Sequence, residues 1–144
     1  MSRQRDKRHA GTFKKSPGET FPARRVQRSP DRQRSIERRR RLAMSGPMPP
    51  HLACQFTVGE LAALRIVADE SRQHGGCRLH LDAIAARAGV CRSTAQNALR
   101  AARRLGLITV QERRRRGMAS LTNVVRIVSR EWQVWNERGE GSKK

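Results

Sequence analysis

The sequence predicts a mostly helical fold that ends in a small β-hairpin and follows a basic segment without regular structure. Apolar residues recur at helical spacing in residues 56–73 and again in residues 81–105. Two stretches rich in β-branched residues follow, at 107–113 and 121–129, and the loop between them contains the turn residue Gly117. A short helix with two tryptophans closes the expected order, which is α, β, α, α, β, β, α.

The domain organisation is expected to have three parts. Residues 1–50 are expected to form a disordered basic tail and linker, because Arg, Ser, Pro and Gln dominate and apolar side chains are too sparse for a core. The linker lies at residues 46–50 (GPMPP), where adjacent prolines stop a helix. An anionic partner would favour a helix at residues 35–42, but a solvated tail is the preferred interpretation over a dedicated binding arm. The folded domain is expected to span residues 51–138, with a flexible C-terminus at 139–144.

The charge of the chain indicates a polyanionic partner. The 144 residues include 32 Lys and Arg against 12 Asp and Glu, a formal charge of +20. Residues 1–50 carry 15 basic and 4 acidic side chains and residues 51–144 carry 17 and 8, so each part is basic in its own right. DNA, RNA and an anionic membrane surface are the candidate partners. No apolar run approaches the ~20 residues needed to cross a bilayer.

The first helix of the domain has clear signals at both ends. Thr57 is the expected N-cap, and Glu60 three residues later completes a capping box. Gly75 and Gly76 end the helix. A short extended piece at residues 77–80 is expected to follow.

The spacing after this piece is typical of a helix-turn-helix. Helices are expected over residues 81–89 and from 92 to about 105. Ala85 is small enough for the helix crossing, Gly89 can adopt the positive φ that the turn needs, and Val90 is placed to fill the angle between the helices.

The second of these helices is expected to bury a stripe of Ala95, Ala98 and Leu99 and to expose a polar face. Such a helix fits the major groove, where Arg pairs with guanine and Gln or Asn with adenine. Its first-turn amides can also hold a phosphate. Three arginines, Arg100, Arg103 and Arg104, lie too far toward the C-terminus of the helix to reach base edges, so we expect them to contact the DNA backbone. The exposed face comprises Arg92, Ser93, Thr94, Gln96, Asn97 and Arg100, and the further backbone contacts are Arg103 and Arg104.

Four consecutive arginines, Arg113, Arg114, Arg115 and Arg116, lie at the tip of the expected hairpin. The hairpin would lie beside the second helix, and narrow minor grooves attract arginine. The alternative is that these charges only keep an exposed tip soluble. Because neighbouring arginines repel one another, contact with a phosphate or a minor groove is the preferred interpretation.

Residues 84–99 fit the pattern I-A-x-x-A-G-V-[SC]-R-x-T-x-x-x-x-L, and residues 105–108 follow with L-G-L-I. This pattern resembles the winged helix-turn-helix DNA-binding domains of bacterial regulators and plasmid replication initiators, over about residues 56–129. Residues 123–132 resemble a group found on alphaproteobacterial plasmids and mobile elements. Cys91 departs from the pattern, since Ser is usual at this N-cap and a thiol is a poorer acceptor; Ala95 is smaller than the usual Val or Ile. The matching residues are Ile84, Ala85, Ala88, Gly89, Val90, Arg92, Thr94, Leu99, Leu105, Gly106, Leu107 and Ile108.

The function expected from these features is sequence-specific binding of double-stranded DNA, as a transcriptional regulator that acts as a repressor. The alternatives are a plasmid replication or maintenance factor at an origin, and a nucleoid-type protein that binds RNA or DNA without sequence preference. An enzyme is not expected, because the acidic residues are scattered and no glycine-rich phosphate loop is present. A cytoplasmic, nucleoid-associated protein is expected, as a monomer or a homodimer, with no membrane and no small-molecule ligand.

No metal or cofactor is expected. His74, Cys77 and His80 lie close together in the sequence, but their spacing matches no tetrahedral zinc site. Trp132 and Trp135 stand at helical spacing, and we expect them to pack onto the first helix of the domain rather than to stack on bases.

Overall fold

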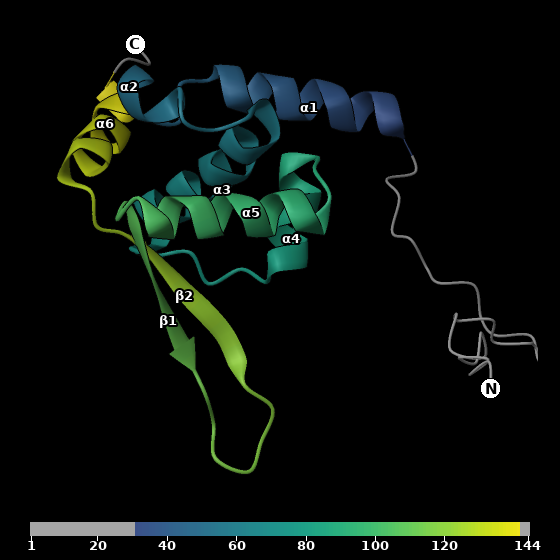
Figure 1. The fold of residues 1–144 in the computed structure, drawn as a ribbon, viewed down its shortest axis with the longest axis vertical. Coiled ribbons are helices and arrows are strands. Elements are labelled where there is room, and N and C mark those ends of the chain that lie inside the picture. The colour runs from purple at the N-terminus through teal and green to yellow at the C-terminus, as the bar shows by residue number, and fades with distance from the viewer. Residues whose placement is uncertain (1–30, 142–144) are drawn as a thin grey trace, which may run out of the picture.

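Six helices and a two-stranded antiparallel hairpin make up this computed structural model, which describes residues 31–141 (Figure 1). The fold is mostly helical with a small β-hairpin after the helices, as the sequence predicts. None of the helices in this range is long and apolar enough to cross a membrane. The elements are α1 (Arg32–Met44), α2 (Pro50–Ala53), α3 (Val58–His74), α4 (Leu81–Ala88), α5 (Arg92–Arg104), β1 (Ile108–Arg113), β2 (Leu121–Ile127) and α6 (Arg130–Gly141).

Helix α3 lies at the centre of the domain and contacts α1, α4, α5, β2 and α6. The predicted capping box is confirmed: the Glu60 amide donates to Thr57 Oγ1 over 3.3 Å, and the Thr57 amide donates to the Glu60 carboxylate over 3.2 Å. The helix ends at Gly75, as predicted. Its small and branched side chains fill the core, with Ala62, Ala63, Leu64, Val67 and Ala68 fully buried.

Helices α4 and α5 form the predicted helix-turn-helix. Gly89 follows α4 with φ 72°, in the left-handed region that glycine adopts without a steric penalty. The next amide, that of Val90, donates to the Ala85 carbonyl over 3.0 Å and closes the turn. The Val90 side chain is half-buried against the core, as expected for the residue between the two helices.

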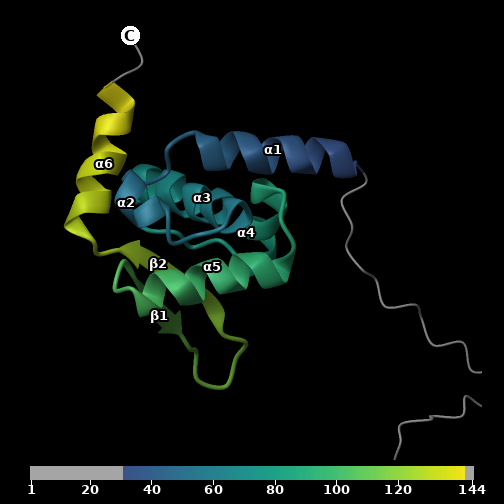
Figure 2. The ribbon, with the colours of Figure 1, turned by 45° about the horizontal axis from the view of Figure 1, so that its top comes forward.

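The hairpin pairs Ile108 with Ile127 and Val110 with Val125, and its register shifts between Gln111 and Arg113. The extended piece predicted at residues 77–80 pairs with this sheet through Cys77, which exchanges two backbone hydrogen bonds of 2.8 Å with Val125. We call residues 108–127 the wing. In both views, the wing and α1 lie on opposite sides of α5 (Figures 1 and 2).

The structure corrects the expected boundary of the tail, because residues 32–44 form α1 and pack on α3 and α4. Asp31 caps the helix by accepting a hydrogen bond from the Arg34 amide. The following segment is also folded, and Met48 is almost fully buried. The prediction failed partly because the half-buried side chains of α1 include Arg38 and Arg39, whose apolar stems do not register as apolar in the sequence. The tail prediction for residues 1–30 lies outside the described residues.

Helix α6 ties the C-terminal end to the segment after α1. Trp132 is fully buried and its Nε1 donates to the Pro47 carbonyl over 2.8 Å, which confirms its core position. The expected core position of Trp135 is wrong in part: this side chain stays 39% exposed while its Nε1 donates to the Gly46 carbonyl. The helix continues to Gly141 and so includes residues 139–141 of the predicted flexible C-terminus, and residues 142–144 lie outside the description.

Candidate nucleic-acid interface

Helix α5 buries one narrow face and exposes a wide polar one. The buried face consists of Ala95, Ala98 and Ala102, whose small side chains allow close packing on α3. Leu99, expected in the buried stripe, is half-buried. The exposed side chains match the predicted face and its backbone-contacting extension, namely Arg92, Ser93, Gln96, Asn97, Arg100, Arg103 and Arg104.

Thr94 departs from the prediction that it belongs to the exposed face. Its side chain is half-buried, and its Cγ2 lies so close to Gly59 that a Cβ on that glycine would be 2.9 Å away. Its Oγ1 lies 3.1 Å from Cys91 Sγ. Thr94 therefore packs the first turn of α5 against the start of α3, which explains why a small residue stands at position 59.

Arg92 is held by a partner that sequence reasoning missed. Its guanidinium lies 3.3 Å from the Asp82 carboxylate, which projects from the first turn of α4. Both side chains are more than half exposed, at 67% and 57%, so water screens the pair and it contributes at most about 1 kcal/mol. The pair can orient the guanidinium and still release it to another acceptor.

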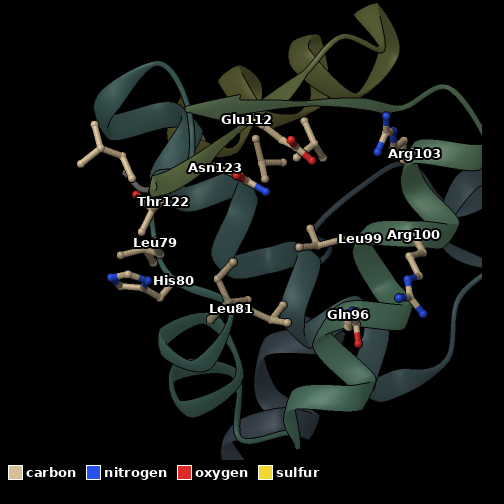
Figure 3. Close-up of a pocket in the computed structure, with 14 residues that line it drawn as sticks. Leu79, His80, Leu81, Gln96, Leu99, Arg100, Arg103, Glu112, Thr122 and Asn123 are labelled. Atoms are coloured by element: carbon tan, nitrogen blue, oxygen red, sulfur yellow. The ribbon is translucent and has the colours of Figure 1, made fainter. Parts of the chain in front are cut away.

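A hollow of about 520 Å³ separates α5 from the wing (Figure 3). Gln96, Arg100 and Arg103 line its α5 side, and Glu112, Thr122 and Asn123 line its wing side. The residue that precedes α4, His80, also lines it. The polar face of α5 and the wing therefore open onto the same surface. The apolar lining comprises Leu79, Leu81, Ile84, Leu99, Val110, Leu121 and Val125.

The four wing arginines are not equivalent. Arg113 ends β1, and its guanidinium donates to the Thr122 carbonyl over 2.7 Å and to the Thr122 hydroxyl over 2.8 Å. These bonds hold Arg113 to β2 and leave its side chain half-buried, so its contact with DNA stays a prediction. Arg115 donates to the Ala119 carbonyl within the loop, and Arg114 pairs with Glu112 at 3.0 Å. Arg114, Arg115 and Arg116 are exposed at the tip.

The acidic groups near this surface are paired, which leaves its charge positive. Asp82 faces Arg92, and Glu112 on the rim of the hollow faces Arg114. Residues 31–141 carry 21 basic and 10 acidic side chains, a charge of +11. Within this range no group of three His, Cys, Asp or Glu side chains could hold a metal ion.

Cys91 occupies the N-cap of α5 and makes no capping hydrogen bond, as expected of a weak acceptor. The Thr94 hydroxyl beside the Cys91 sulfur lowers the pKa of the Cys91 thiol, and the backbone N–H of Thr94 has the next largest effect in the same direction. Burial has the opposite effect on Cys77, where loss of water raises the thiol pKa.

A lowered pKa increases the thiolate fraction at a given pH, and the thiolate is the nucleophile. We therefore expect iodoacetamide to modify Cys91 well before Cys77, as followed by mass spectrometry of peptides over a pH series. Replacing Thr94→Val should shift the pH profile of Cys91 to higher pH and leave that of Cys77 unchanged. Equal rates for the two thiols, or an unshifted profile in the variant, would contradict this account of the helix start.

Comparison of the chain with protein-family models, with curated proteins and with solved structures found no match.

Proposed function

We propose that the protein binds double-stranded DNA in a sequence-specific manner, with α5 as the recognition helix in the major groove. The observation that carries this proposal is that the polar face of α5 and the arginine-bearing wing flank one hollow. A single helix fits the width of the major groove, so a wing on the same surface reaches the DNA next to it.

Base contacts are assigned to the N-terminal half of α5. Arg92 suits the O6 and N7 acceptors of guanine, while Gln96 and Asn97 suit the N6 and N7 groups of adenine. All three side chains are exposed. The first turn contains no acidic residue, so its free amides and the helix dipole favour a nearby phosphate.

The hollow is proposed to face the sugar-phosphate strand that separates the major from the minor groove. Arg100 and Arg103 supply positive charge from α5, and Thr122 and Asn123 supply polar groups from β2. Such contacts set the position of a protein on the duplex and carry no direct sequence information. Glu112 would repel this strand if alone, but Arg114 offsets its charge.

The biological role that we propose is a transcriptional regulator that represses by occupying a promoter. Selection of binding sites from random duplex, followed by their location in the genome, tests this role. Sites over a promoter support it, whereas direct repeats at a replication origin would favour a replication or maintenance factor. Affinities for the best and for random duplex within about tenfold of each other would favour the nonspecific alternative, because specific binders differ by ~10³ or more.

Replacing Arg114→Gln and Arg116→Gln together should weaken binding to all duplexes by the same factor. If each arginine meets one phosphate, the slope of log K against log salt falls by about 1.8, at 0.9 per contact. Affinity titrations at several salt concentrations measure this slope. The matched control is Arg130→Gln with Arg138→Gln, two arginines of α6, which lies away from the wing (Figure 1). A wing variant that changed the preferred sequence, or left the slope intact, would contradict the assignment.

A further inference from the structure

Helix α1 is a basic element that has no part in the proposed binding of the major groove by α5. It carries six arginines and one glutamate over 13 residues. Four of its arginines are exposed, and Arg38 and Arg39 are half-buried where the helix packs on the domain. Six arginines repel one another along a short helix, and fixing them in one place by folding adds to that cost. A polyanion bound to this helix would relieve the repulsion.

Two contacts fix α1 directly on the helix-turn-helix. A Cβ on Gly89 would collide with the Ser35 carbonyl oxygen, so the backbone of α1 touches the turn between α4 and α5. Arg38 donates from its guanidinium to the Ala86 carbonyl at the end of α4 over 2.9 Å. The position of α1 relative to α5 is therefore set by backbone and side-chain contacts rather than by a loose linker.

One side of α1 lies next to the first turn of α5. The Arg39 stem passes Gly59, with its Cδ 3.7 Å from the position of a Cβ there. The same position is 2.9 Å from Cγ2 of Thr94 in the first turn of α5 and 3.4 Å from Cγ1 of Val90 in the turn that precedes it. Arg32 precedes Arg39 by seven residues, so it lies on the same side of α1 two turns earlier.

This side of α1 borders the flank of α5 that the wing does not reach. The wing shares its hollow with Gln96, Arg100 and Arg103, which occupy the other flank of α5. Figures 1 and 2 agree that α1 and the wing stand on opposite sides of the recognition helix. Positive charge therefore continues across the molecule from the wing through α5 to Arg39 and Arg32.

We propose that α1 is a third DNA-contacting element, whose Arg32 and Arg39 hold phosphates at the end of the site opposite to the wing. This inference rests on the proposed binding of duplex DNA by α5. The contact is to the sugar-phosphate backbone: it lengthens the bound segment and adds affinity without sequence preference. A rigid α1 places these charges at a fixed distance from the recognition helix, which a flexible tail would not do.

The test compares two pairs of substitutions in the full chain. Arg32→Gln with Arg39→Gln removes two charges from the side near α5, and Arg34→Gln with Arg41→Gln removes two from the other side at the same seven-residue spacing. Binding to a selected site is measured over a salt series, with hydroxyl-radical footprints of each complex. Thermal unfolding of every variant checks the fold, and Arg32→Lys with Arg39→Lys restores the charge.

The first pair should lower the salt slope by about 1.8 and the affinity at 0.15 M salt by about 30-fold, the factor that two such contacts supply. Its footprint should lose protection at one end only, the end opposite to that lost in the Arg114 and Arg116 variant. The lysine variant should recover most of the affinity. Equal effects of the two glutamine pairs, or an unchanged footprint, would overturn the role of α1. The proposed function would still stand in that case, provided that the wild-type protein binds the selected site. Failure of the wild-type protein to bind any duplex would overturn the proposed function itself.

Discussion

Replacing Arg92→Ala and Gln96→Ala together is expected to remove most of the preference of the protein for its best DNA site. Both side chains are exposed on the N-terminal half of α5. Each good bidentate contact contributes roughly 1–3 kcal/mol of discrimination between bases, so the pair should cost at least about 30-fold in the ratio of specific to random affinity. Competition titrations with the selected site and with random duplex measure this ratio.

The matched control for this variant is Arg103→Ala with Arg104→Ala, which lie in the last turn of the same helix. They are assigned to the backbone, so they should weaken specific and random duplex by the same factor and leave the ratio unchanged. A further variant, Asp82→Asn, removes the carboxylate that holds Arg92 and tests whether that pair orients the guanidinium. If the backbone pair changed the ratio and the base-reading pair did not, the division of roles along α5 would be wrong.

Replacing Gly89→Ala is expected to destabilise the domain by several kcal/mol. At φ 72° a side chain costs roughly 1–2 kcal/mol, and the added Cβ would also collide with the Ser35 carbonyl oxygen of α1. The colliding atom belongs to the backbone, so relief requires α1 to move away from the turn. Denaturant unfolding of the variant and of the wild type measures the loss of unfolding free energy.

Gly106→Ala provides the control for this substitution. Gly106 has nearly the same φ, 73°, but a Cβ there meets nothing within 4 Å. This variant should lose only the roughly 1–2 kcal/mol of unfolding free energy that a side chain costs at this φ. The difference between the two losses then reports the docking of α1 on the helix-turn-helix. Equal losses would mean that α1 does not lie against the turn in solution.

The helix-turn-helix and the hairpin could be predicted because their signals are local. Thr57 and Glu60 form a capping box within four residues, and Gly89 marks a turn that requires positive φ. Gly117 lies in the loop between two stretches of β-branched residues. Most of the polar face of α5 follows from helical periodicity, which places buried and exposed residues on opposite sides of the helix. Thr94 is the exception, because it packs against Gly59 of α3.

The parts that escaped prediction depend on contacts between distant residues. The sequence predicts a disordered tail where α1 forms, because arginine-rich segments are typically solvated. The hydrogen bond from Arg38 to the Ala86 carbonyl joins residues 48 positions apart, and no local pattern indicates it. The pairing of Arg113 with Thr122 depends on the register of the hairpin. The sequence predicts Trp132 in the core, but nothing local indicates that the Pro47 carbonyl is its hydrogen-bond partner.

In the proposed function, α5 reads base sequence in the major groove while the surfaces beside it hold the sugar-phosphate backbone. The most direct measurement is the affinity of the purified protein for its best site, selected from random duplex, against its affinity for random duplex at 0.15 M salt. We expect the selected site to bind about 10³-fold more tightly or better. A ratio within about tenfold would contradict base reading by α5 and leave only charge-driven binding.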